Sequence, residues 1–299
     1  MDLPTPAPAA GEIRLRVHAA GVNPVDWKIR EGRVQARIPG AFPLIPGWDA
    51  AGTVDACGPG AGLFRPGDAV FAYCRKPVIQ HGTYAEFVCI PEAFAAAKPS
   101  KLSFEEAAAV PLAALTAYQS LVEAAGLRVG DKVLVHAAAG GVGGFGLQIA
   151  KILGAYVIAT AGTANQAAVR ALGADTVIDY TREDFVDAVR LRHPQGIDIA
   201  FDTVGGDVQS RSALVLRKAG ILVSILALQD EAALRAKGIE TRYVFVAPNA
   251  AQLGVLGRWV DAGVLKVPLA EVLPLEQAAR AHELSESGHV RGKIVLRIV

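Results

Sequence analysis

The sequence predicts an α/β protein that combines a β-rich domain with a doubly wound parallel sheet. Two patterns indicate this fold class. The first part of the chain is rich in glycine and proline between short β-prone runs, which favours a compact β-rich domain over residues 1–112. From Phe104 onward, strand-like and helix-like segments alternate, as in a parallel sheet covered by helices. We expect residues 113–262 to form this second domain and residues 263–299 to rejoin the first.

The individual elements follow from the same patterns. The β-rich domain is predicted to contain strands at residues 12–17, 50–54, 68–72 and 83–88. A helix is expected at residues 105–125. The parallel sheet is predicted to have six strands, at residues 133–136, 156–160, 176–179, 197–202, 221–225 and 242–246. A last strand at residues 292–298 is expected to return to the β-rich domain.

Composition narrows the class of protein. The chain has 299 residues, of which 52% are hydrophobic and 20% are charged, so there is enough apolar material for buried parallel strands. The net charge of +1 gives no reason to expect nucleic acid or an anionic membrane as a partner. No signal peptide or membrane-spanning run is evident, which predicts a cytoplasmic protein. The three cysteines lack C-x-x-C spacing, so neither a disulfide framework nor a cysteine-rich zinc site is indicated.

A glycine-rich turn within residues 132–151 is the most informative motif. An apolar run, this turn and an amphipathic segment follow one another without a gap. Gly140, Gly141, Val142 and Gly143 let the backbone approach a pyrophosphate, which helix N–H groups would then bind. Ala138 stands where the strict G-x-G-x-x-G pattern has its first glycine, so the surrounding strand and helix pattern has to support the assignment. The motif predicts a dinucleotide-binding unit and therefore hydride transfer.

Several further segments carry a resemblance to a known family. They are residues 21–26 (GVNPVD), 46–52 (PGWDAAG), 81–87 (HGTYAEF), 107–118 and 292–295 (GKIV), together with the glycine turn. In this order they resemble the zinc-independent quinone oxidoreductases of the medium-chain dehydrogenase/reductase superfamily, which include zeta-crystallin. The resemblance implies a GroES-like domain and a Rossmann domain.

The resemblance also bears on zinc. The positions of the catalytic zinc ligands in zinc-dependent relatives are similar to Asn23, Trp48, Asp49 and Leu112 of this chain, and this set is poorly suited to zinc. The six histidines are scattered along the sequence, which is typical of surface or hydrogen-bonded histidines. We therefore expect no zinc and a substrate that accepts hydride at a carbon, namely a quinone or an α,β-unsaturated carbonyl.

Four residues are predicted on the substrate side. By resemblance, Asn23 places a polar group beside the substrate, although an asparagine before Pro24 can also serve only to cap a turn. Trp48 and Tyr73 are expected to form a wall on which a flat substrate stacks, with simple core packing as the alternative. Thr116 resembles a residue that contacts the nicotinamide ribose or ring, and a helical threonine bonded to its own backbone is the competing interpretation.

Cofactor choice depends on the end of the second strand of the parallel sheet. That segment has no acidic residue, and Gly162 and Thr163 leave room for a 2′-phosphate, so NADPH is favoured over NADH. Relatives often carry a lysine where Asn165 stands, and one expected charge is therefore absent. Tyr180 resembles a tyrosine near the same phosphate, and Arg182 could supply the missing charge. Both are equally compatible with plain loop residues.

The remaining predicted contacts lie later in the chain. Thr203 and Val204 are expected to touch the cofactor, with a plain glycine-rich turn as the alternative. The strand that ends with Phe245 and Val246 resembles a segment that lies along the carboxamide and pairs two subunits, which predicts a homodimer. Arg291 and Lys293 could reach the cofactor phosphates, although charged residues that flank a final strand are more often solvated.

Three functions remain open at this stage. The leading one is an NADPH-dependent reductase of quinones or conjugated carbonyls. The second is a reductase of an acyl chain held on a carrier. The third is a non-catalytic NADPH-binding protein, as crystallins and RNA-binding members of the family are, although no strongly basic surface supports RNA binding.

Overall fold

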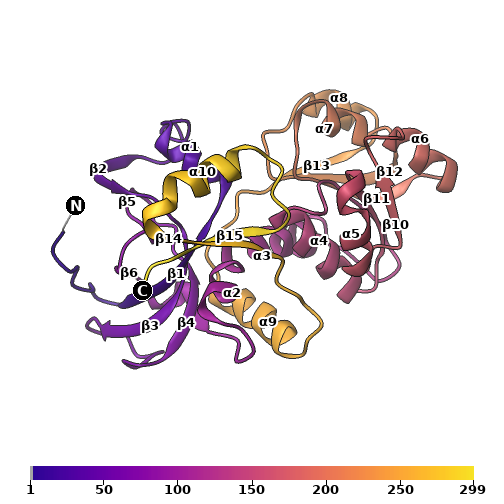
Figure 1. Cartoon of the computed structure of the whole chain (residues 1–299). Coiled ribbons are helices and arrows are strands. Elements are labelled where there is room, and N and C mark those ends of the chain that lie inside the picture. The colour runs from indigo at the N-terminus through magenta and orange to yellow at the C-terminus, as the bar shows by residue number, and fades with distance from the viewer. Residues whose placement is uncertain (1–2) are drawn as a thin grey trace. The chain divides into compact units, whose positions relative to one another are not determined.

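The computed structural model describes residues 3–299 and divides into two compact units (Figure 1). Unit 1 comprises the chain up to Leu115 together with Ala247–Val299, and unit 2 comprises Thr116–Val246. The chain thus returns to unit 1 at Ala247, earlier than the expected residue 263. The reason is helix α9 (Ala250–Asp261), which is close to the unit 1 core: a Cβ added to Gly257 would lie 3.6 Å from the Phe71 ring.

Unit 1 is built on a seven-stranded sheet in the order β14-β15-β1-β3-β4-β7, with β6 also paired to β1. Its strands are β1 (Glu12–Val22), β3 (Asp49–Cys57), β4 (Ala69–Tyr73), β6 (Phe87–Pro91), β7 (Ala95–Ala97), β14 (Leu269–Pro274) and β15 (Lys293–Arg297). A separate pair consists of β2 (Gly40–Ile45) and β5 (Ile79–His81). The long β1 pairs with β6 through its first half and with β15 through its second. The last segment of the chain therefore completes the first sheet, as expected.

The predicted strand at residues 83–88 begins only at Phe87. The backbone N–H of Thr83 donates to the carbonyl of Gly47 at 3.0 Å, and that of Tyr84 donates to Pro46 at 3.1 Å. These residues are therefore bonded to the loop before β3 instead of a neighbouring strand.

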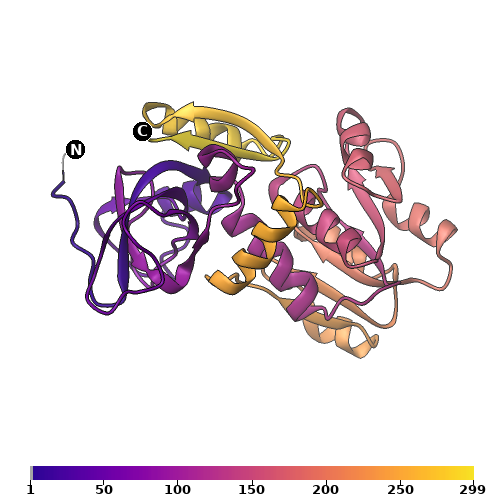
Figure 2. The same ribbon diagram turned by 90° about the horizontal axis from the view of Figure 1, so that it is seen from below.

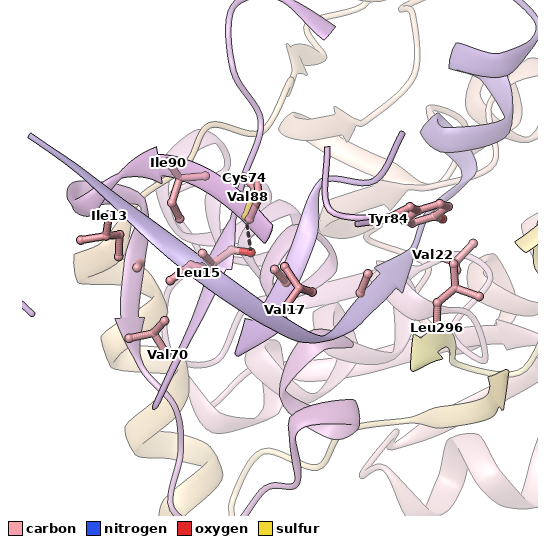
Figure 3. Packing of buried hydrophobic residues seen from close by; sticks show 14 of the residues in the cluster. Ile13, Leu15, Val17, Val22, Val70, Cys74, Tyr84, Val88, Ile90 and Leu296 are labelled. Atoms are coloured by element: carbon pink, nitrogen blue, oxygen red, sulfur yellow. Dashed lines mark hydrogen bonds between the residues drawn. The ribbon is translucent and has the colours of Figure 1, made fainter. Parts of the chain in front are cut away.

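The core of unit 1 lies on one face of β1. Ile13, Leu15 and Val17 alternate along the strand and so point to the same side, where they join Val70 of β4 and Ile90 of β6 (Figure 3). All five side chains are fully buried. The apolar alternation in the sequence thus corresponds to the inward face of this sheet.

Short helices connect and cover the strands of unit 1. They include α1 (Pro24–Arg30), α2 (Phe104–Ala108), α3 (Pro111–Tyr118) and α10 (Ala278–Glu286). The single helix expected at residues 105–125 is therefore divided, because Pro111 lacks an N–H and begins a new helix. A π-helical segment, Gln119–Ala124, follows α3. Figure 2 shows β14 and β15 side by side, with α10 along them.

Unit 2 is a six-stranded parallel sheet, as predicted. Its order is β10-β9-β8-β11-β12-β13, and every neighbouring pair is parallel. The strands are β8 (Lys132–Val135), β9 (Tyr156–Ala161), β10 (Thr176–Asp179), β11 (Ile197–Asp202), β12 (Leu216–Ser224) and β13 (Glu240–Tyr243). The order reverses at β8, which makes the edge beside this strand the switch point where doubly wound sheets bind ligands.

Helices α4 (Gly141–Ile152), α5 (Gln166–Ala171), α6 (Phe185–Arg192), α7 (Gly206–Ser212) and α8 (Glu231–Ala236) accompany the sheet of unit 2. The strand predicted at residues 242–246 ends at Tyr243, so Phe245 and Val246 follow it. Among residues 3–299, no helix is long and apolar enough to cross a membrane.

Candidate cofactor and substrate sites

Most of the predicted cofactor residues follow the carboxyl ends of strands in the unit 2 sheet. All six strands are parallel, so their carboxyl ends meet at the same edge. The glycine turn follows β8, Gly162 and Thr163 follow β9, Tyr180 and Arg182 follow β10, Thr203 and Val204 follow β11, and Phe245 and Val246 follow β13. The topology thus brings together segments that are far apart in the sequence.

The glycine turn is tightly built around Ala137. This residue has a φ of +46°, so the left-handed conformation is adopted by an alanine, one residue before the position where a glycine was expected. A Cβ on Gly143 would lie 2.3 Å from the carbonyl oxygen of Ala137, which only glycine can avoid. Gly140 is the N-cap of α4 and supplies no side-chain cap. The first-turn N–H groups of this 12-residue helix are therefore oriented for an anion, and the cradle fits a dinucleotide pyrophosphate.

Buried polar groups fix the strand ends beside this turn. His136 Nδ1 lies 3.2 Å from Thr160 Oγ1 and its Nε2 lies 2.8 Å from Ser212 Oγ. Burial lowers the pKa of His136 to about 4, so the imidazole is neutral near pH 7. Thr203 Oγ1 donates to the carbonyl oxygen of His136 at 2.9 Å. Of the two predicted contacts after β11, Thr203 is thus hydrogen-bonded to the end of β8, whereas Val204 is exposed.

A second group of polar residues surrounds the ends of β9 and β10. Tyr180 is 60% exposed, and a Cβ on Gly162 would lie 3.4 Å from its hydroxyl oxygen. The Thr163 hydroxyl donates to Asp179 Oδ2 at 2.5 Å. Arg182 has an exposed side chain whose Nε lies 3.7 Å from the same oxygen. Asn165 is the N-cap residue of α5 and makes no side-chain cap. All of the residues predicted at the 2′-phosphate position except Asn165 thus lie around Asp179. No sequence pattern had indicated Asp179.

The contacts predicted after β13 differ in exposure. Phe245 is partly exposed, whereas Val246 is buried. Thr116, the first residue of unit 2, is also buried and lies within α3. The roles of these residues toward a cofactor stay predictions.

A buried ionic cluster is the main polar feature of unit 1. Asn23 is 2% exposed, and its Nδ2 donates to Asp49 Oδ2 at 2.8 Å. Lys293 Nζ donates to Asn23 Oδ1, donates to the Val22 carbonyl at 2.8 Å and lies 3.7 Å from Asp49 Oδ2. Lys293 is thus buried, contrary to the expectation that it is solvated or near cofactor phosphates. The side chain of Asn23 therefore links the members of this cluster, and the residue itself is the N-cap position of α1.

Asp26 extends the cluster on the other side of Asn23. Its Oδ2 accepts the backbone N–H of Asn23 at 2.8 Å and the Tyr84 hydroxyl at 3.1 Å. Its Oδ1 is buried and has no hydrogen-bond partner among residues 3–299. Burial raises the pKa of Asp26 to about 7 and that of Asp49 to about 6, and it lowers the pKa of Lys293. The cluster therefore changes its protonation near neutral pH.

This raised pKa predicts how the stability of unit 1 depends on pH. Folded Asp26 holds its proton up to about pH 7, whereas an unfolded aspartate loses it near pH 4, so stability falls as pH rises between these values. Between pH 5 and pH 7, we expect the unfolding free energy of the wild type to fall by about 2 kcal/mol more than that of Asp26→Asn. Urea unfolding followed by tryptophan fluorescence measures this, because Trp27, Trp48 and Trp259 all lie in unit 1.

The control is Glu283→Gln, which removes an exposed carboxylate from the same unit and should follow the wild-type profile. Equal losses in Asp26→Asn and the wild type would show that Asp26 does not titrate in this range.

The two predicted aromatic residues are packed into unit 1. Trp48 and Tyr73 meet edge to face, with ring centroids 6.2 Å apart, and both are buried. The Cys74 backbone N–H donates to the Trp48 carbonyl at 2.6 Å, which fixes the entry to β3. This packing favours the core interpretation of these residues, and a substrate wall stays a prediction.

The residues at the expected zinc positions do not fit a zinc ion. The Asn23 amide is bonded to Asp49 and Lys293, and the ammonium group is a poor neighbour for a dication. Asp49 Oδ1 accepts the backbone N–H of Leu112 at 2.8 Å, so this carboxylate is bonded to the residues at two other zinc-ligand positions, Asn23 and Leu112. Over the described part of the chain, no three His, Cys, Asp or Glu side chains group to hold a metal.

Sequence reasoning missed Asp26 and Asp179, and it placed Lys293 near the cofactor phosphates or in solvent instead of in the buried cluster. Asp26 and Lys293 stand inside the motifs GVNPVD and GKIV, so their position was a usable signal, but no local pattern shows that they are buried together. The fold and the two sites indicate the class of protein. It is an oxidoreductase of two units, with a candidate dinucleotide site at the carboxyl ends of the unit 2 strands.

Comparisons with known proteins agree with this class. A family model described as "Alcohol dehydrogenase GroES-like domain" matches residues 9–100, and one described as "Zinc-binding dehydrogenase" matches residues 172–296. The chain is 34% identical to the chloroplast envelope quinone oxidoreductase homolog of Arabidopsis thaliana, covering 99% of this chain and 92% of the relative. It is 35% identical to the 2-methylene-furan-3-one reductase of Solanum lycopersicum, covering 95% of this chain and 71% of the relative.

Solved structures show the same likeness. The quinone oxidoreductase from Coxiella burnetii superposes with a TM-score of 0.87 at 34% identity, covering 100% of this chain and 94% of the other. A mycobacterial protein solved in complex with NADPH has a TM-score of 0.88 at 29% identity, with the same two coverages. The chain therefore belongs to the medium-chain dehydrogenase/reductase family and is an oxidoreductase of the NAD(P)H-dependent type.

Proposed function

We propose that this protein is a zinc-independent, NADPH-dependent reductase that transfers hydride to a quinone or an α,β-unsaturated carbonyl. The observation that carries the proposal is the donor set of unit 1: at two positions similar to the zinc ligands of zinc-dependent relatives, Asn23 and Asp49 are bonded to each other and lie against the Lys293 ammonium group. Oxidation of an alcohol without a Lewis acid would need another group to stabilise the alkoxide. Reduction of a conjugated carbonyl needs less stabilisation, because the enolate that forms requires only hydrogen-bond donors at its oxygen and a proton.

The chemistry needs a hydride donor and stabilisation of an enolate. When bound, the cofactor supplies the hydride. A quinone or enone that accepts it at carbon becomes an enolate, which needs hydrogen-bond donors at its oxygen and then a proton. Asn23 has two Nδ2–H bonds, of which one is donated to Asp49. We assign the second as the candidate donor to substrate, with Lys293 holding the amide in this orientation through Oδ1.

Several features support NADPH as the cofactor. Gly162 and Thr163 leave space at the end of β9, and the Tyr180 hydroxyl and Arg182 lie at the end of β10 beside them. Hydroxyl and guanidinium groups suit a 2′-phosphate. The mycobacterial structural relative is complexed with NADPH, which is consistent with this choice.

We also propose a homodimer formed through β13. In the described chain, this strand lies at the edge of the sheet and pairs only with β12, and the exposed Phe245 follows it. A sheet edge of this kind is suited to pairing with a second copy.

The proposed activity is tested by following NADPH absorbance with a small panel of simple quinones and enones. We expect turnover that is faster with NADPH than with NADH and that is unchanged by a metal chelator. Turnover that stops with chelator would contradict the zinc-free proposal.

The same experiment separates the alternative functions. NADPH binding with no turnover of any free quinone or enone would favour a carrier-bound acyl substrate or a non-catalytic role. Testing a carrier-bound enoyl thioester next would distinguish these two, because only a reductase of carrier-bound acyl chains would consume NADPH.

A further inference from the structure

Asp179, the last residue of β10, forms the centre of the polar group at the ends of β9 and β10. The Thr163 hydroxyl donates to its Oδ2 at 2.5 Å, and the Thr181 hydroxyl donates to its Oδ1 at 2.6 Å. The Thr181 backbone N–H adds a third bond to Oδ1 at 3.1 Å. Hydrogen bonds from Thr163 and Thr181 lower the pKa of Asp179, so the carboxylate is ionised at neutral pH.

These bonds use the groups that would otherwise suit a phosphate. A hydroxyl has one proton to donate, and both threonines donate theirs to Asp179. Arg182 Nε lies 3.7 Å from Asp179 Oδ2, so the nearby positive charge is already opposed by a negative one. A 2′-phosphate bound here would have to compete with the carboxylate for the same donors and would also be repelled by it.

The carboxylate lies next to the space assigned to this phosphate. In the parallel register, Asp179 pairs with Ala161, the residue before Gly162. The hydroxyl oxygen of Tyr180 would be 3.4 Å from a Cβ on Gly162. Asp179 therefore lies beside Gly162, which leaves space for the 2′-phosphate, and beside Tyr180, which is proposed to bind it.

We propose that Asp179 is a specificity-determining residue that weakens binding of the 2′-phosphate and thereby narrows the preference for NADPH over NADH. This inference rests on the proposed function, because it concerns the same dinucleotide edge. The sequence has no acidic residue at the end of the second strand of the sheet, and the carboxylate comes instead from the end of the third.

Asp179→Asn tests the proposal, because the amide keeps the size of the side chain and removes its charge. Dissociation constants for NADPH and NADH are measured by isothermal titration calorimetry at low ionic strength. We expect the constant for NADPH to fall about fivefold and the constant for NADH to change less than about twofold. 2′,5′-ADP and 5′-AMP should show the same difference, which removes any contribution from the nicotinamide.

Asp187→Asn is the matched control, because Asp187 is an exposed carboxylate on α6 of the same unit. It changes the net charge of unit 2 equally and should leave both constants unchanged. An unchanged NADPH-to-NADH ratio in Asp179→Asn, or an equal shift in Asp187→Asn, would overturn the inference while leaving the proposed function intact. Failure of the wild type to bind either dinucleotide would overturn the proposed function itself, and the inference with it.

Discussion

Gly143→Ala is expected to weaken NADPH binding by at least about 100-fold. The added Cβ would lie 2.3 Å from the Ala137 carbonyl oxygen and 2.9 Å from that of His136, and both are backbone atoms that no side-chain rotation can move away. The turn must therefore shift by about 1 Å, which separates the first-turn N–H groups of α4 from the pyrophosphate. Titration of NADPH fluorescence measures the affinity, and near-UV circular dichroism verifies that the variant is folded.

The matched control is Gly254→Ala in helix α9 of unit 1. A Cβ at this position would meet only the end of the Arg258 side chain, at 3.6 Å. The same chemical change should leave the affinity unchanged and stabilise the helix slightly. A folded Gly143→Ala protein that binds NADPH as tightly as the wild type would refute the assignment of this turn to the cofactor.

The parallel sheet was predictable because its central strands are buried on both faces. Such strands appear as continuous apolar runs, and the runs at residues 133–136 and 156–160 overlap β8 and β9. The glycine residues after the first of these runs then predicted the turn between β8 and α4. The candidate residues that follow strand ends could be grouped from the sequence for this reason, since a parallel sheet places all carboxyl ends at one edge.

Asp179 could not be found in this way, because its role depends on register. It lies 16 residues after Thr163 in the sequence, and only the pairing of β9 with β10 brings the two side chains together. The rule that places a specificity-determining acid at the end of the second strand therefore considered too short a segment of the chain.

The Lys293 cluster required even longer-range information. Lys293 is 271 residues from Val22, and they meet because β15 pairs with the second half of β1. A lysine at the start of a final strand ordinarily extends into solvent. Here the strand register directs it inward, toward two carboxylates whose burial no sequence pattern indicated.

Lys293→Met is expected to produce a large loss of stability in unit 1, about 3–5 kcal/mol at pH 8. The methionine fills a similar volume but leaves Asp49 and Asp26 buried without their cation. Both carboxyls then charge less readily, so their pKa values rise further. Unfolded aspartates release their protons near pH 4, and stability is therefore lost as pH increases through the folded values. The loss should be smaller at pH 5, where the folded carboxyls are mostly protonated.

Urea unfolding followed by tryptophan fluorescence at pH 5 and pH 8 measures this difference. Lys101→Met, which removes an exposed lysine of the same unit, should unfold like the wild type at both pH values. Adding Asp49→Asn to Lys293→Met should recover part of the loss at pH 8, because one uncompensated charge is removed. If Lys293→Met lost equal stability at both pH values and Asp49→Asn recovered nothing, the lysine would be stabilising unit 1 through packing alone. A pH-dependent loss with partial recovery is the result that requires its charge.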